Sequence, residues 1–190
     1  METFAVYWEP IIKTYGISER TGLCLVTLDL PFHRINDAGG WLTRLASRFD
    51  SSLVLIFSRP ATPAGLKLHL LLDKPPEKVE LDKINAAEKN TQPDPSMDMN
   101  PDAFDGAFSG LRVDNPVELV YFQGPHYGDR YGIASAAMTA LAEKKVPLLA
   151  VVCTGASVYL ITPTGKALEA RKALGQAFST PQTGKSESET

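Results

Sequence analysis

The sequence contains few of the residues and runs that mark several common protein classes. It holds 2 cysteines and 3 histidines in 190 residues and has no CxxC pair, so we expect no structural zinc site. Lysine and arginine (19) do not outnumber aspartate and glutamate (22), so a nucleic-acid partner is not expected. No apolar run approaches the roughly 18 residues of a membrane helix. The start METFAVYWEP lacks signal-peptide character. We therefore expect a cytoplasmic protein without cofactor, metal or membrane partner.

The two cysteines lie in apolar surroundings. Cys24 and Cys153 each belong to an apolar run, which predicts two buried and unreactive thiols. Nothing in the sequence supports a disulfide between them.

The first half of the chain contains one helical pattern among several strand patterns. Runs rich in branched and aromatic residues predict strands over 4–10, 11–17 and 22–30. Trp41, Leu42, Leu45 and Phe49 then recur at helical spacing. Residues 53–72 form two apolar runs around a Pro/Gly turn and predict a hairpin. A short helix is expected over 79–89.

The middle of the chain changes in composition. Residues 90–115 are dense in Pro, Asp, Asn and Gly and have no sustained period, which is typical of a linker or long surface loop. We therefore divide the chain into a first unit (1–89), this linker, a second unit (116–178) and a polar, disordered tail (179–190).

The second half repeats the order of the first. Strand patterns over 117–124, 146–155 and 156–163 alternate with helical patterns over 133–145 and 166–178. The predicted helix faces are Ile133, Ala137, Met138 and Leu141, and then Leu168, Arg171, Leu174 and Phe178. The two halves are offset by about 95 residues, which indicates an internal duplication.

This repeated order predicts an α+β fold. A β-α-β-β-α unit closed by one more strand is the ferredoxin-like (βαββαβ) arrangement, an antiparallel sheet with helices on one face. We expect two such units. The source of each closing strand stays open, with residues 4–10 and an exchange of strands between the repeats as alternatives.

A glycine-bearing loop precedes the helical pattern of the second half. Gly124, Gly128 and Gly132 lie four residues apart in GPHYGDRYG. Glycine lets the backbone approach a ligand closely, and the first amides of a helix suit a carboxylate or phosphate. A plain strand-to-helix turn is the alternative. The spacing matches neither GxGxxG nor GxxxxGK[ST], so a nucleotide site is not expected.

The second half also resembles a known family. The segments Gly132-Ile133-Ala134, Ala140-Leu141-Ala142-Glu143 and Ser157-Val158-Tyr159-Leu160 are similar to the ACT domain, in particular to the regulatory ACT repeats of aspartate kinases. The match covers about 60 residues of the second half, and the first half is similar mainly in its order of elements. No kinase portion is recognisable, so the resemblance implies a tandem ACT-like regulatory protein rather than a kinase.

The resemblance implies a regulatory site for an amino acid or a similar metabolite. In the family, backbone groups of the first loop, the helix start and an adjacent strand hold the ligand between paired domains. We expect Arg130 to pair with a ligand carboxylate and Asp129 with an ammonium group. The ligand-binding candidates are Gly124, His126, Gly128, Asp129, Arg130, Gly132, Ile133, Ala134, Thr154 and Ser157.

Two other functions stay open. A small enzyme would use His126, Asp129 and Cys153, and His33, His69, Asp29 and Asp37 are further acid–base candidates. No HxxxH, HExxH or paired-carboxylate pattern supports catalysis, so we assign no catalytic residue. A protein-interaction module would instead pair through its sheet edges. We expect a homodimer and leave open a biosynthetic enzyme as a partner.

Overall fold

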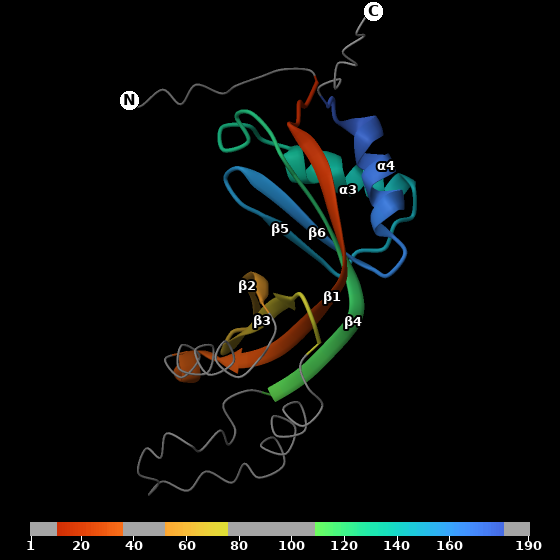
Figure 1. Cartoon of the computed structure of the whole chain (residues 1–190). Helices are drawn as coiled ribbons and strands as arrows, with labels where there is room; N and C mark the ends of the chain where they lie inside the picture. Colours follow the sequence, from red (N-terminus) through yellow and green to blue (C-terminus); the bar gives the residue numbers. More distant parts are fainter. Residues whose placement is uncertain (1–10, 36–51, 76–108, 181–190) are drawn as a thin grey trace, which may run out of the picture. The chain divides into compact units, whose positions relative to one another are not determined.

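The structure, a computed structural model, describes residues 11–35, 52–75 and 109–180. The described elements follow one another in chain order as shown in Figure 1: β1 (Gly16–Pro31), η1 (Phe32–Arg34), β2 (Leu53–Thr62), β3 (Gly65–Leu72), β4 (Ser109–Gln123), α3 (Ile133–Glu143), β5 (Ala150–Cys153), β6 (Ser157–Pro163) and α4 (Ala167–Ala177). The predicted α+β class with antiparallel strands is confirmed. None of the described helices is long and apolar enough to span a membrane.

The chain forms two compact units that do not follow its two sequence halves. The terminal unit comprises residues 1–21 and 117–190, and the central unit comprises residues 22–116. Both long strands, β1 and β4, contribute residues to each unit. Residues 109–115, which the sequence places in a linker, form the first part of β4.

In the terminal unit, the strand order is β1-β4-β6-β5. Strands β4 and β6 pair antiparallel from Val117↔Pro163 to Gln123↔Ser157, and β5 pairs antiparallel with β6. Alternation along β4 and β6 points Val120, Phe122 and Leu160 into one core with the two helices. Other core residues are Tyr127, Ile133, Ala137, Leu141, Val146, Val158, Ala167, Ala170, Ala173, Leu174 and Phe178.

The two helices bury smaller side chains than their periodicity predicts. Met138 and Leu168 are wrong core predictions, because they are 43% and 47% exposed. Ala140 and Ala170 are buried instead. Alanine has the highest helix propensity and lets helices approach closely, so these faces combine helix formation with tight packing.

A buried carboxylate satisfies the start of α4. The Ala167 amide donates a 2.7 Å hydrogen bond to Glu118 Oε2, and Glu118 is only 8% exposed. Lys166, the preceding N-cap residue, provides no side-chain cap. Because a negative charge is favourable at a helix N-terminus, Glu118 fixes α4 onto β4 from 49 residues away in the chain.

In the central unit, the strand order is β2-β3-β1-β4. The predicted hairpin is confirmed, since β2 and β3 pair antiparallel, and β3 also pairs antiparallel with β1. One sheet face carries a core of Cys24, Val26, Leu28, Leu30, Leu68, Leu70 and Leu72. The expected strand over 4–10 and the expected helices over 41–49 and 79–89 lie outside the described residues.

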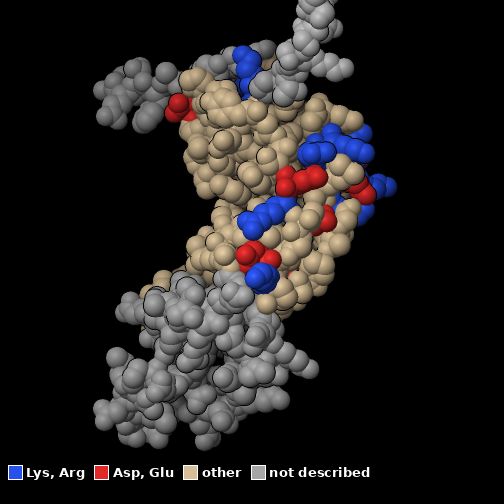
Figure 2. Space-filling view, viewed as in Figure 1, with Lys and Arg blue, Asp and Glu red and all other residues tan. Residues whose placement is uncertain are grey.

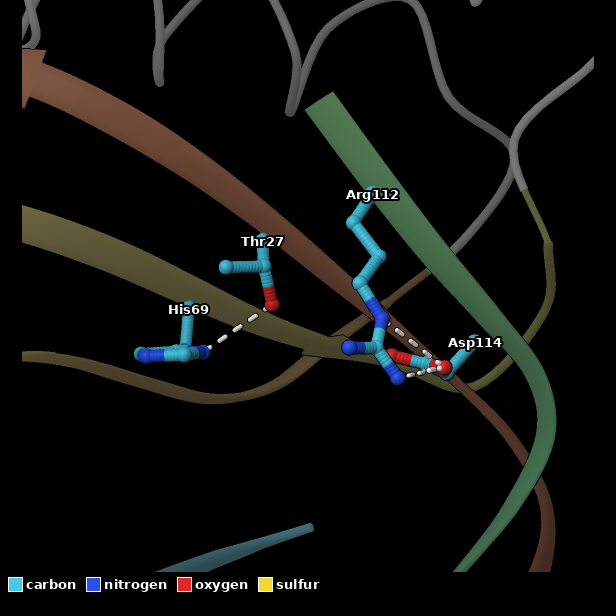
Figure 3. Close-up of polar contacts among 4 residues, drawn as sticks. All are labelled: Thr27, His69, Arg112 and Asp114. Atoms are coloured by element: carbon cyan, nitrogen blue, oxygen red, sulfur yellow. Dashed lines mark hydrogen bonds and ion pairs between the residues drawn. The ribbon is translucent and has the colours of Figure 1, made fainter. Parts of the chain in front are cut away.

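The opposite face of this sheet carries a row of polar groups. His69 on β3 stacks on Phe57 of β2 with ring centroids 4.6 Å apart, and its Nδ1 lies 3.0 Å from the Thr27 hydroxyl (Figure 3). Arg112 donates to Asp114 on β4, at 2.8 Å from Nη2. His69 is only 6% exposed, so its polar contact is with Thr27 rather than with solvent.

The position of His69 predicts a pH-dependent stability. Burial lowers its pKa below 6.5, and the positive charges of Arg59 and Lys67 lower it further, against the opposing effect of Asp29. Below pH 6.5 the unfolded state therefore binds a proton that the folded state resists, and stability falls as the pH falls. Urea unfolding at pH 7.5 and 5.5 should show a smaller loss for His69→Gln than for the wild type. An equal loss in both proteins would contradict the assignment.

Candidate functional site

A buried tyrosine anchors the glycine loop (residues 124–132). Tyr127 is 7% exposed, and its ring meets Phe122 edge-on at 6.0 Å. A Cβ added at Gly124 would lie 2.7 Å from Tyr127 Cζ and would also overlap the Lys13 carbonyl. Gly124 therefore lacks a side chain because Tyr127 and Lys13 fill that space, and not because a ligand does.

The glycine loop packs against the turn between β5 and β6 (residues 154–157). A Cβ added at Gly128 would lie 3.1 Å from the Gly155 carbonyl oxygen. The turn itself is closed by Thr154, whose amide donates to the Ser157 carbonyl at 2.9 Å. The Ser157 amide in turn donates to the Thr154 hydroxyl at 3.1 Å. The glycine loop and the 154–157 turn, which the resemblance assigns to one ligand site, therefore lie side by side.

The start of α3 presents backbone amides at the end of this loop. Gly132 precedes the helix with a φ of 88°, a left-handed conformation that favours glycine. Its carbonyl accepts the first helical bond, from Ala136 at 2.8 Å. Among the described residues, no side chain caps these amides and no acidic residue lies in the first turn. An anion or a carboxylate would find both donors and a favourable dipole here.

The charged side chains of the loop lie at its surface. His126 Nδ1 is 3.9 Å from Asp129 Oδ2, and the two side chains are 51% and 71% exposed. Arg130 is half-buried and donates to the Ile11 carbonyl at 3.3 Å. On the face drawn in Figure 2, the Lys and Arg side chains lie beside Asp and Glu side chains rather than forming one basic surface.

The structure gives the predicted site residues different roles. Gly128, Asp129, Gly132 and Ala134 lie in or directly after the loop with some exposure. The Ile133 side chain is buried in the core, so only its backbone could contact a ligand. The Thr154 hydroxyl is used within its own turn. Sequence reasoning missed Tyr127 as the loop anchor, although an aromatic residue between glycines was the available signal.

The thiols lack the properties of activated nucleophiles. Burial raises the pKa of Cys24 to about 11, with Asp114 adding to the effect. Desolvation also raises the pKa of Cys153, whereas reactive thiols have a lowered pKa. Both cysteines are free, and the burial predicted for Cys153 is wrong because it is exposed. Within residues 11–35, 52–75 and 109–180, no three metal-ligating side chains gather.

The remaining acid–base candidates do not converge on the thiol. His33 is exposed within η1, and Asp29 forms an ion pair with Lys67 in the central unit. Asp37 lies outside the described residues. From the residues considered for catalysis, His126 and Asp129 lie 3.9 Å apart, and the charge of Asp29 acts on His69 in the central unit.

Several solved structures with a similar fold belong to aspartate kinases. The ligand-free regulatory subunit of aspartate kinase from Thermus thermophilus matches with a TM-score of 0.64 at 13% identity, over 87% of this chain and 99% of that one. The chain has the fold of an aspartate kinase regulatory subunit. The predicted resemblance is thereby confirmed for the fold. No protein-family model matches, and no curated protein matches.

Longer aspartate kinase chains match over about a third of their length. Aspartate kinase from Clostridium acetobutylicum has a TM-score of 0.63 at 17% identity, over 90% of this chain and 36% of that one. Aspartokinase III from E. coli, in complex with lysine and aspartate (T-state), has a TM-score of 0.52 at 15% identity, over 91% of this chain and 35% of that one. The chain therefore spans about a third of these kinases.

Proposed function

We propose that the protein is a regulatory protein that binds a small carboxylate-bearing metabolite, an amino acid, at the glycine loop of the terminal unit. The ligand would contact the loop, the first amides of α3 and the 154–157 turn. The contact of Gly128 with Gly155 carries the proposal, because it places loop and turn side by side near a helix start that no described side chain caps.

Charge complementarity supports an amino acid as the ligand. The α3 amides would hold its carboxylate, with Arg130 as a second partner, and Asp129, which is 71% exposed, would hold its ammonium group. The E. coli kinase of the same fold holds lysine and aspartate. The loop here is aromatic, with Tyr127 buried and Tyr131 87% exposed, so we expect its ligand preference to differ from that of the E. coli kinase.

The wider proposal is a tandem ACT-like protein without catalysis of its own. Each unit would be a ferredoxin-like βαββαβ unit, with β4 closing the central unit and β1 closing the terminal one. Regulation would follow from a ligand preference for one of two states, typically about 1–3 kcal/mol. A homodimer and a biosynthetic enzyme are the partners that this scheme would use.

A protein-interaction module is the second candidate. Strand β2 ends the strand order in the central unit, and within the described residues it pairs only with β3. Leu53 and Ile56 on β2 are 46% and 41% exposed. An exposed apolar edge strand can pair with a strand of another protein. A partner strand at β2 would therefore account for the exposure of Leu53 and Ile56, and this function needs no small ligand.

A thermal-shift screen of the purified protein against the twenty amino acids tests the proposed ligand class. A ligand at about 100 times its dissociation constant stabilises the folded state by about 2.7 kcal/mol. We expect at least one amino acid to raise the melting temperature in a saturable way. No shift with any amino acid would contradict the proposed ligand and favour the interaction module.

A further inference from the structure

A short N-terminal segment, here called the strap (residues 11–15), lies along the glycine loop of the terminal unit. The Thr14 hydroxyl and the Tyr15 amide both donate to the Gln123 carbonyl, at 2.7 and 2.8 Å, directly before the loop. Arg130 donates to the Ile11 carbonyl at 3.3 Å. The Lys13 carbonyl occupies the space beside Gly124. The loop therefore has contacts with the strap at both of its ends.

The strap is also bound to the segment that follows α4. The Thr14 amide donates to the Ser179 carbonyl, and the Ser179 amide donates to the Ile12 carbonyl, both at 2.9 Å. Lys13 and Ser179 form a parallel bridge. Ser179, which the sequence assigns to the tail, therefore pairs with the strap. The strap joins the loop to the end of α4.

Thr14 is the buried residue of the strap. Thr14 is 1% exposed, whereas Ile11 and Tyr15 are 58% and 63% exposed. The buried Tyr127 side chain lies close to Thr14, whose hydroxyl offsets part of the rise that burial causes in the tyrosine pKa. Thr14 is thus bound to the strand end through its hydroxyl, and displacement of the strand end would expose it.

We infer that the strap and the glycine loop open and close as one element, so that ligand binding at the loop changes how the strap is held. Whether the loop is occupied would then determine how firmly the strap (residues 11–15) is held. Local openings of this kind involve contiguous hydrogen-bonded segments with few buried contacts. The ligand part of this inference rests on the proposed function, whereas the coupling of strap and loop rests on the contacts alone.

Amide hydrogen exchange of the ligand-free protein tests the coupling without any ligand. The substitution Thr14→Val keeps the side-chain shape and removes the hydroxyl bond to Gln123. We expect the Asp129 amide, which donates to the His126 carbonyl within the loop, to exchange at least tenfold faster. Thr139→Val on the exposed side of α3 is the matched control and should change neither segment.

The reverse substitution completes the test. Gly128→Val should displace the loop from Gly155 and speed exchange of the Thr14 amide by a similar factor, because coupling between two sites is reciprocal. The Leu160 amide in β6 must stay at its wild-type rate in both variants, which separates local opening from global unfolding. Changes confined to the substituted segment would overturn the coupling. If no amino acid raises the melting temperature, the proposed ligand is wrong. The exchange rates of the ligand-free variants still test the coupling between strap and loop.

Discussion

Replacing Ser135 with glutamate is expected to weaken binding of an amino acid by at least tenfold while leaving the fold as stable or more stable. Ser135 is exposed in the first turn of α3, which carries no acidic residue. A carboxylate there interacts favourably with the helix dipole, typically by about 0.3–1 kcal/mol. The same charge would occupy the amides that a ligand carboxylate needs. Calorimetric titration and thermal melting of one sample measure both effects.

Two matched variants separate charge from shape at this position. Ser135→Gln has the size of glutamate without its charge, and it should retain most of the affinity. Thr139→Glu places the same charge about one turn further along the exposed side of α3, beyond the free amides, and should have little effect. A tenfold loss costs about 1.4 kcal/mol of binding free energy. Equal affinities of Ser135→Glu and Ser135→Gln would show that no ligand carboxylate lies at the helix start.

The second large effect is expected at Gly124. Gly124→Ala forces a Cβ to within 2.7 Å of Tyr127 Cζ and against the Lys13 carbonyl. Overpacking a tight site typically costs about 1–3 kcal/mol, and the displaced strap would add its hydrogen bonds to this cost. We expect a loss near the upper end of this range in urea unfolding.

Gly155→Ala is the control for this substitution. A Cβ at Gly155 meets no atom within 4 Å, so its free energy of unfolding should change by less than about 0.5 kcal/mol. If Gly124→Ala is as stable as the wild type, the strap and Tyr127 can move apart at little cost. Tyr127 would then not anchor the loop.

The order of the described elements could be predicted from local patterns. The runs over 53–72 alternate around a Pro/Gly turn, and the structure contains the hairpin of β2 and β3 there. The residues of α3 are strong helix formers behind Gly132. Such elements depend on neighbours within a few residues, so periodicity and turn residues suffice to predict them.

The division of the chain into units could not be predicted in the same way. Strands β1 and β4 are 16 and 15 residues long and belong to both units. Residues 109–115 are rich in loop-forming residues by composition, yet they join β4. Strand pairing between residues distant in sequence decides such cases, and local propensity does not report it.

The position of the glycine loop directly before α3 was predicted, but its internal contacts were not. The spacing of Gly124, Gly128 and Gly132 was interpreted as room for a ligand, whereas the neighbour that the structure gives Gly128 is the 154–157 turn. Gly124 lies against Tyr127, which is close in sequence, and against Lys13 of the strap, which is more than 100 positions away. Local patterns do not report the second contact. Exposure of Cys153 was also missed, because β5 ends there at a turn rather than continuing into the core.

The central claim is that a small carboxylate ligand binds where the glycine loop, the start of α3 and the 154–157 turn meet. The most direct measurement is a titration of ¹⁵N-labelled protein with each stabilising amino acid, followed by amide chemical shifts. We expect the largest shifts at Gly128, Gly132, Ile133 and Ala134, with smaller ones at Thr154 and Ser157. Saturable shifts confined to other residues, or no shifts at millimolar amino acid, would contradict the account.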